Sequence, residues 1–242
     1  MAFVVTLTMG TLLIVPGSLL EQLTRIVSGV CDQKHPLLFG RVTLPLCQRD
    51  TGIYTSALCT VLTLLALGRG HAAVSPPRAI TRVLLVGALG MVGDGVNSWL
   101  FDYGPTYLYT PQPLLRILSG IAMGIALATY LLFALNALLR QHPDRDLRVL
   151  YLWRELGVVG LVNILVFAVL HLRLPGLAYP VALFSTLGLL VMSLGMNLLL
   201  VGVLGRFTHT FIRWGQLARP GTLALALTAI EFWLFVGLRH PQ

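Results

Sequence analysis

The sequence predicts an all-α, polytopic membrane protein in which six to seven transmembrane helices form one bundle. Apolar residues make up 56% of the 242 residues, charged residues make up only 11%, and the mean hydropathy is +0.83. A soluble domain usually carries roughly 25% charged residues, so this chain lacks the polar surface that a soluble enzyme needs. The apolar residues also lie in continuous runs, which indicate membrane helices rather than the alternating strands of a β-barrel.

Seven apolar runs follow one another along the chain, and gaps that contain proline separate most of them. Proline lacks the backbone N–H and clashes with the preceding turn, so Pro76-Pro77 and Pro143 indicate helix ends. The second and seventh runs are short, which is why the predicted number is six or seven. We expect the whole chain, residues 1–242, to be one integral membrane domain. The expected spans are residues 2–20, 53–68, 83–100, 114–139, 149–172, 180–204 and 221–238.

One further helix, over residues 205–219, is expected to lie flat on the membrane surface. Apolar residues recur there at helical spacing, whereas polar and basic residues occupy the opposite face. This pattern is typical of an interfacial amphipathic helix; a simple connection between two spans is the alternative. The apolar face would hold Phe207, Phe211, Trp214 and Ala218, and the polar face Arg206, His209, Arg213 and Gln216.

The chain is basic, with a formal net charge of +8. Its arginines stand in small groups between apolar runs, which is the pattern of loops at a charged membrane face rather than of a nucleic-acid-binding surface. Three gaps, residues 69–82, 140–148 and 205–220, carry three arginines each and share one side of a seven-span arrangement. The positive-inside rule places these gaps and the N-terminus in the cytoplasm, and segment 21–52 outside. We therefore expect a multi-pass protein of the cell membrane that contacts the lipid bilayer and binds no nucleic acid.

The longest gap, segment 21–52, concentrates chemically active side chains at the membrane edge. It contains Cys31-Asp32-Gln33 and, further on, the run Leu44-Pro45-Leu46-Cys47-Gln48-Arg49-Asp50-Thr51-Gly52-Ile53-Tyr54. Later, Asp94-Gly95 lies in one expected span, and Leu115-Arg116-Ile117-Leu118-Ser119-Gly120 opens the next.

On these motifs the chain resembles an uncharacterised prokaryotic family of membrane proteins, domain-of-unknown-function family 2085. In that family a Cys-His-Gln triplet precedes Leu-Pro-hydrophobic-Cys-x-Arg-Cys-Thr-Gly-Ile-Tyr at the start of a span. The resemblance covers roughly residues 25–140, and its more specific part rests on Arg49, Thr51, Gly52 and Tyr54.

The chain departs from the family pattern at two positions, because Asp32 replaces the histidine and Asp50 replaces the second motif cysteine. The family's set of three cysteines and one histidine would suit a tetrahedral zinc site. Since carboxylates also bind metals, the resemblance implies a site of harder character for zinc or another divalent cation. Its ligands would be Cys31, Asp32, Cys47 and Asp50, with His35 as a further candidate. A Cys31–Cys47 disulfide and a pair of reduced, buried thiols are the alternatives.

Four polar residues inside the expected spans form a second candidate site: Asp94, Asn97, Arg116 and Glu231. Ionisable groups at membrane depth are expensive and therefore point to function. The short connection between two neighbouring spans predicts that Asp94 and Arg116 form an ion pair, because pairing avoids burying either charge alone. Glu231 lies in mid-span and needs a polar partner or a proton.

Three classes of function fit these features. The first is a metal- or thiol-dependent site formed by segment 21–52 and the third and fourth spans. The second is a transporter or channel for ions or small solutes that uses Asp94, Arg116 and Glu231. The third is a non-catalytic subunit or assembly factor that has protein partners in a larger membrane complex. The sequence does not decide whether the protein is an enzyme.

Overall fold

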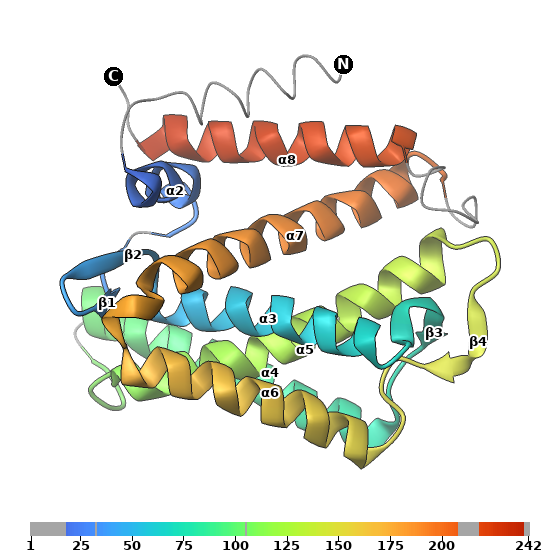
Figure 1. Cartoon of the computed structure of the whole chain (residues 1–242), viewed down its shortest axis with the longest axis horizontal. Helices are drawn as coiled ribbons and strands as arrows, with labels where there is room; N and C mark the ends of the chain where they lie inside the picture. The colour runs from blue at the N-terminus through green and yellow to red at the C-terminus, as the bar shows by residue number, and fades with distance from the viewer. Residues whose placement is uncertain (1–17, 32, 105, 208–217, 240–242) are drawn as a thin grey trace.

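The computed structural model describes residues 18–31, 33–104, 106–207 and 218–239, which form a bundle of long helices (Figure 1). The expected span 2–20 and the expected interfacial helix 205–219 lie largely outside the described residues. The α-helices are α2 (Leu19–Val27), α3 (Gln48–Ala66), α4 (Arg78–Tyr103), α5 (Pro113–Leu139), α6 (Trp153–Leu172), α7 (Ala178–Leu204) and α8 (Ala218–Arg239). The strands are β1 (Pro36–Phe39), β2 (Val42–Cys47), β3 (Ala72–Val74) and β4 (Asp144–Arg148), and short 3₁₀ turns cover Arg69–His71 and Pro175–Leu177.

Helices α4 to α8 are the five described helices that are long and apolar enough to cross a membrane. Each contains most of one expected apolar run. The strands form only two small two-stranded sheets. The prediction of an all-α membrane bundle is therefore confirmed, whereas the number of spans stays a prediction because the first expected span lies outside the described residues.

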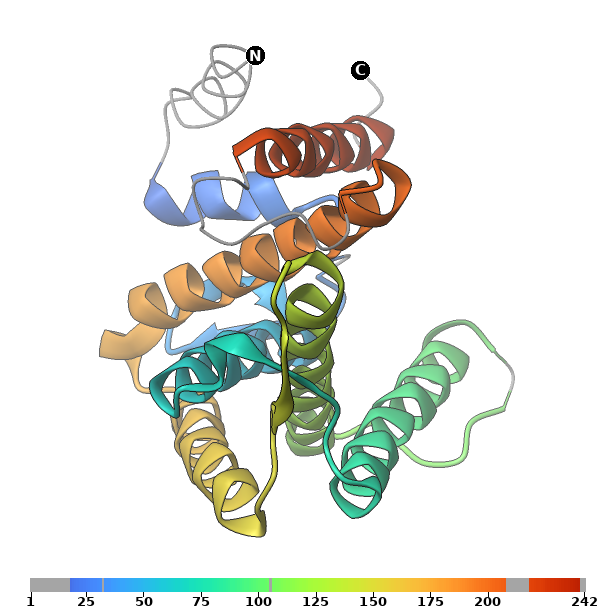
Figure 2. The ribbon, with the colours of Figure 1, turned by 90° about the vertical axis from the view of Figure 1, so that its right-hand side faces the viewer.

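Helix α3 occupies the middle of the bundle, where α5, α6 and α7 pack around it (Figures 1 and 2). It contains the expected span 53–68 except for its last two residues, yet it is too polar to count among the five apolar helices. Its hydroxyls bond to the surrounding helices: Ser56 Oγ donates to the carbonyl oxygen of Ile121 at 3.0 Å, and Asn163 Nδ2 donates to Thr60 Oγ1 at 3.1 Å. Such bonds satisfy polar groups that lipid cannot satisfy, so the bundle can enclose a helix of this polarity.

Glycines bring α3 into direct backbone contact with two neighbours. A Cβ added to Gly120 of α5 would lie 2.4 Å from the carbonyl oxygen of Arg49, and a Cβ added to Gly188 of α7 would lie 2.1 Å from that of Tyr54. Only glycine fits at such distances, because small residues allow helix backbones to approach closely. The close contact fixes the position of α3, and with it the motif residues at its start.

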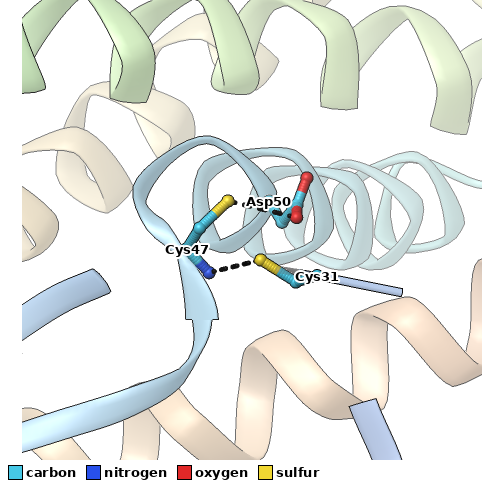
Figure 3. A group of neighbouring side chains, drawn as sticks. All are labelled: Cys31, Cys47 and Asp50. Carbon is cyan, nitrogen blue, oxygen red and sulfur yellow. Dashed lines mark hydrogen bonds between the residues drawn. The ribbon is translucent and has the colours of Figure 1, made fainter. Parts of the chain in front are cut away.

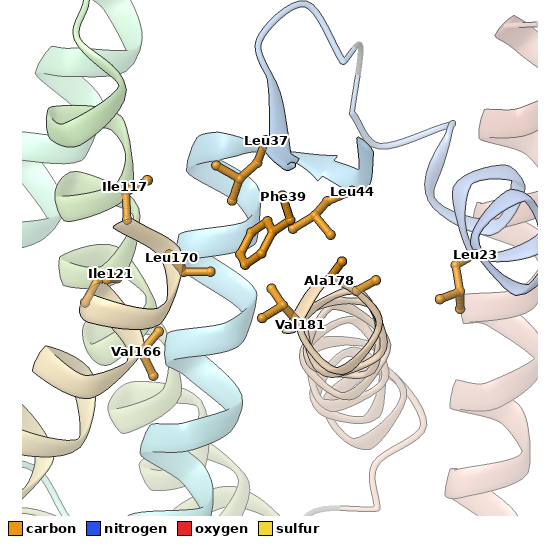
Figure 4. Close-up of a cluster of buried hydrophobic side chains, with 11 residues drawn as sticks. Leu23, Leu37, Phe39, Leu44, Ile117, Ile121, Val166, Leu170, Ala178 and Val181 are labelled. Atoms are coloured by element: carbon orange, nitrogen blue, oxygen red, sulfur yellow. The ribbon is translucent and has the colours of Figure 1, made fainter. Parts of the chain in front are cut away.

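Segment 21–52, the longest gap between the expected spans, is folded. It holds most of α2, the antiparallel hairpin of β1 and β2, and the first turn of α3. Gly40 makes the hairpin turn with a φ of 63°, a conformation that favours glycine. The hairpin side chains Leu37, Phe39 and Leu44 are fully buried in one cluster with residues of α5, α6 and α7 (Figure 4). The hairpin therefore closes one end of the bundle.

The basic gaps 69–82 and 140–148 meet at the opposite end, on one side of the bundle as the sequence predicts. Strand β3 pairs in parallel with β4, and Figure 1 shows this sheet at the other end of the helices from β1 and β2. Arg140 Nη2 donates to the carbonyl oxygen of Gly70 at 2.9 Å. Backbone pairing and this bond join the two gaps.

Candidate functional site

Cys31, Cys47 and Asp50 come together where the hairpin meets the start of α3 (Figure 3). Cys31 follows α2, and its backbone N–H donates to the carbonyl oxygen of Val27 at 3.3 Å. Cys47 ends β2 and is also the residue that precedes the first turn of α3, in extended conformation. Asp50 lies in that first turn. The pairing of β1 with β2 thus carries the chain back to the bundle and sets Cys47 beside Cys31.

Hydrogen bonds link the three residues. The backbone N–H of Cys47 donates to Cys31 Sγ at 3.2 Å, and the Cys47 thiol donates to Asp50 Oδ2 at 3.1 Å. The two sulfur atoms and a carboxylate oxygen all lie within 4.8 Å of one another. Cys31 is buried, and Cys47 and Asp50 are half-buried.

The two thiols differ in acidity. Hydrogen bonding with Cys47 lowers the pKa of Cys31, whereas the hydrogen bond with Cys31, burial and the Asp50 carboxylate raise the pKa of Cys47. The pair therefore favours one thiolate at Cys31 over two. A cation placed among the three ligand atoms would also favour the thiolate form of Cys47, because a bound metal ion deprotonates a coordinating thiol.

The donor set fits a thiophilic divalent cation. In a tetrahedral site with Zn–S bonds of about 2.3 Å, neighbouring ligand atoms lie roughly 3.5–3.8 Å apart, so the observed group, with its atoms within 4.8 Å of one another, needs to contract by no more than about 1.3 Å. The same proximity would let the sulfur atoms of Cys31 and Cys47 form a disulfide; both residues are thiols in the structure.

The other two expected ligands do not extend this group. Asp32 lies outside the described residues. His35 lies in the hairpin segment, and its Nε2 pairs with Asp102 Oδ2 of α4 at 3.0 Å. The structure thus uses His35 to join the hairpin to the end of α4. Next to it, the Lys34 ammonium bonds to the hydroxyl of Tyr103 and lies 3.5 Å from the centre of that ring.

The remaining motif residues organise the start of α3. Thr51 Oγ1 donates to the carbonyl oxygen of Leu46 at 3.2 Å. A Cβ on Gly52 would lie 2.9 Å from the carbonyl oxygen of Ile117, so α5 can approach here only because residue 52 is glycine. Tyr54 packs against the apolar cluster that contains Cys31.

Asp94 of α4 forms its ion pair with Arg49 of α3, so the predicted Asp94–Arg116 pair is wrong. Arg49 Nη2 bonds to Asp94 Oδ2 and also donates to Ser98 Oγ at 2.9 Å. Ser119 Oγ of α5 donates to the same Asp94 oxygen at 3.2 Å. The backbone contact between Arg49 and α5 explains why Asp94 pairs with Arg49 instead of Arg116, because this contact places the Arg49 side chain against the polar face of α4.

Asn97 attaches the connection between α4 and α5 to α4. Its Oδ1 accepts from the backbone N–H of Leu108 at 2.8 Å, and its Nδ2 donates to the carbonyl oxygen of Tyr109 at 2.9 Å. The Tyr109 hydroxyl then donates to Asp94 Oδ1 at 2.7 Å. Burial and this hydrogen bond raise the pKa of Tyr109, which keeps the phenol protonated and able to donate.

Arg116 of α5 lies near Arg49 and Asp94, and only 5% of its surface is exposed. It interacts electrostatically with Arg49, Asp102 and Asp94, but no described carboxylate lies within ion-pairing distance. Its Nε is buried without a hydrogen-bond partner.

Glu231 belongs to a separate polar contact between α7 and α8. Asn197 Nδ2 donates to Glu231 Oε2 at 2.6 Å and to Thr228 Oγ1 at 3.0 Å. The expectation that Glu231 needs a polar partner agrees with this contact. Figures 1 and 2 show α8 and α4 on opposite sides of the bundle, so Glu231 does not join the group around Asp94.

Sequence reasoning named Arg49 only as part of a motif and missed its role as the partner of Asp94. The one available signal was its place next to Asp50 at the start of an apolar run, where a charge needs a partner. The bonds of Ser98 to Arg49 and of Ser119 to Asp94 were not predicted either, because a serine hydroxyl in a helix can equally bond a carbonyl oxygen of its own preceding turn.

Residues 31–130 match the family model described as "Predicted membrane protein (DUF2085)". The match begins at Cys31 and extends into α5, so it includes the Cys31, Cys47 and Asp50 group as well as Arg49, Asp94 and Arg116. It confirms the resemblance that the motifs indicate. No curated protein and no solved structure matches the chain.

Proposed function

With this family match as the premise, we propose that the protein is a multi-pass protein of the cell membrane that binds a divalent metal ion, best suited by zinc. The ligands are Cys31 Sγ, Cys47 Sγ and an Asp50 carboxylate oxygen. The observation that carries the proposal is the approach of these three atoms to within 4.8 Å of one another, from the segment after α2, the end of β2 and the first turn of α3.

The donor chemistry selects the metal. Two thiolates favour zinc and other thiophilic ions over magnesium or calcium, which prefer oxygen ligands. With Cys31, Cys47 and Asp50 bound, the ion would carry three protein ligands. A zinc ion with three protein ligands keeps a coordination position for water or a substrate, as catalytic sites do, whereas structural sites use four. The proposal therefore includes a site that can activate a bound water or polarise a substrate.

The proposed orientation places the metal group at the outer face. The arginine-rich gaps that β3 and β4 join would face the cytoplasm, by the positive-inside rule. The hairpin and the start of α3 lie at the opposite end of the bundle (Figure 1) and would face outward.

The transporter alternative receives less support. Its three residues would have to share one polar path, but Glu231 bonds to Asn197 on the far side of the bundle from Asp94. The alternative of a subunit in a larger complex has no observation that favours it. Apolar side chains are exposed along α4, including Val86, Leu89 and Val92, but lipid would cover them as well as a protein partner would.

The test is the metal content of the full chain, purified in a mild detergent without chelators and measured by elemental mass spectrometry. We expect one zinc ion per chain, its loss in Cys47→Ser, and weaker binding in Asp50→Asn. Cys59→Ser is the matched control. Cys59 lies on α3 outside the group of three ligands, so this variant should keep the metal.

Thiol counting with and without a reductant completes this experiment. If the protein is metal-free and its thiol count rises by two after reduction, Cys31 and Cys47 form a disulfide and the metal-site proposal is refuted. A metal-free protein with all three thiols reactive would refute the proposal.

A further inference from the structure

Arg116, in the first two turns of α5, is a buried cation that lacks a bonded anion among the described residues. It is 5% exposed, its Nε has no acceptor, and the described carboxylates lie beyond ion-pairing distance. A guanidinium group carries five N–H donors and keeps its charge at physiological pH. A buried charge with no partner is strongly unfavourable, so the position calls for an acceptor that the described residues do not supply.

A second arginine adds to the excess of positive charge. Arg49 lies close enough to Arg116 for the two guanidinium groups to repel each other, and Arg49 Nε is also buried without an acceptor. Asp94 balances one of the two charges through its bond to Arg49. Asp102 interacts with Arg116 at longer range and is already bonded to His35. At ion-pairing distance, therefore, the described residues set one carboxylate, that of Asp94, against two guanidinium groups.

The surrounding backbone also favours an anion. Helix α5 starts at Pro113, three residues before Arg116, and Gln112 makes no side-chain bond to its first turn. Helix α3 starts beside it, again without a side-chain cap. The N-terminal ends of helices carry partial positive charge and N–H groups that bind phosphate and carboxylate. The Ser98 hydroxyl accepts from Arg49 Nη2 and keeps its own hydrogen to donate.

We propose that Arg116, together with Arg49 Nε and the Ser98 hydroxyl, binds an oxyanion, a phosphate or carboxylate group, at the outer edge of the bundle. The guanidinium of Arg116 can hold two oxygens of such a group through parallel N–H bonds. The group belongs either to a free solute or to the headgroup of an anionic phospholipid. This site uses different atoms from the proposed metal site and does not depend on a bound metal.

The experiment measures the melting temperature of the full chain, delipidated in a neutral detergent. One arm adds inorganic phosphate, with chloride at equal ionic strength as the reference. The other arm reconstitutes the protein in phosphatidylcholine bilayers with and without phosphatidylglycerol. A rise of the melting temperature with phosphate identifies a free anion, and a rise only with phosphatidylglycerol identifies a lipid headgroup. Either rise supports the site if it depends on Arg116.

Variants test that dependence. Arg116→Gln should weaken the apparent affinity by roughly tenfold or more, because a charge-assisted pair is lost, and Arg116→Lys should lie in between. Arg41→Gln is the control, an exposed arginine at the same end of the bundle, and should respond like the wild type. Without ligand, Arg116→Gln should melt at or above the wild-type temperature, which also shows that it folds. Absence of any rise in the wild type, or an equal rise in Arg116→Gln, would overturn the proposal.

Discussion

Arg49 and Asp94 form an ion pair between a half-buried guanidinium and a buried carboxylate, and it joins the first turn of α3 to the C-terminal half of α4. Asp94 is 4% exposed, and its two carboxylate oxygens also accept hydrogen bonds from Tyr109 and Ser119. Three elements that are distant in sequence therefore meet on one carboxylate. Because the Asp94 carboxylate is buried, loss of the pair should affect stability far more than the loss of a surface pair would.

Removing either partner of this pair should destabilise the protein by about 3–5 kcal/mol, because the other charge stays buried. We expect this for Asp94→Asn and for Arg49→Met, and a loss well below the sum of the two for the double variant Arg49→Met/Asp94→Asn. The measurement is a double-mutant cycle on the unfolding free energy of the full chain in detergent, with Arg41→Met as the exposed control. Additive losses in the double variant would show that the pair is not coupled.

The second prediction concerns the stability that the close contact between α5 and α3 provides. Gly120→Ala should destabilise the chain by about 1–3 kcal/mol, since the added methyl overlaps the backbone of Arg49 and the helices must separate. Gly93→Ala is the matched control, because a Cβ there meets nothing within 4 Å. The two variants add the same methyl group inside a helix, so their difference in melting temperature isolates the packing effect. Equal melting temperatures would contradict the close contact.

Hydropathy was enough to predict the five long helices, because lipid requires continuous apolar runs of about 20 residues whatever the tertiary arrangement. The alternation of spans was enough to place gaps 69–82 and 140–148 on one side, and the pairing of β3 with β4 brings these two gaps together. The hairpin could not be predicted in the same way. Its strands of four and six residues are short, and the run Leu37-Leu38-Phe39 is apolar throughout although Leu38 is exposed.

The ion pair shows the other limit. Helical periodicity identified Asp94 and Arg116 as residues on facing helices, but it carries no information about a third helix that lies against both. Arg49 reaches Asp94 because Gly120 lets α3 approach α5. The proximity of Cys31, Cys47 and Asp50 was easier to anticipate, since the family resemblance already named these positions among the candidate ligands.

Metal binding at Cys31 and Cys47 should strengthen as the pH rises. The raised pKa of Cys47 means that its thiol is protonated at neutral pH without metal, and a proton must leave when the ion binds. The zinc affinity should therefore fall steadily below neutral pH and increase above it. Titration calorimetry in two buffers of different ionisation enthalpy measures the protons released, and Asp50→Asn should keep the sign of the pH dependence. A zinc affinity that does not change with pH would exclude thiolate ligands.

The orientation of the bundle can be tested with single cysteines at its two ends. In a variant with Cys31, Cys47 and Cys59 replaced by serine, Arg41→Cys lies in the hairpin turn and Arg145→Cys in β4. Both positions are exposed, so accessibility to a small reagent should differ only by the side of the membrane. A membrane-impermeant maleimide should label Arg41→Cys in intact cells and Arg145→Cys only after permeabilisation, because the arginine-rich end is expected inside. The reverse pattern would place the cysteines of the metal group in the cytoplasm, where glutathione keeps thiols reduced. That outcome would exclude a disulfide and leave metal binding as the chemistry open to Cys31 and Cys47.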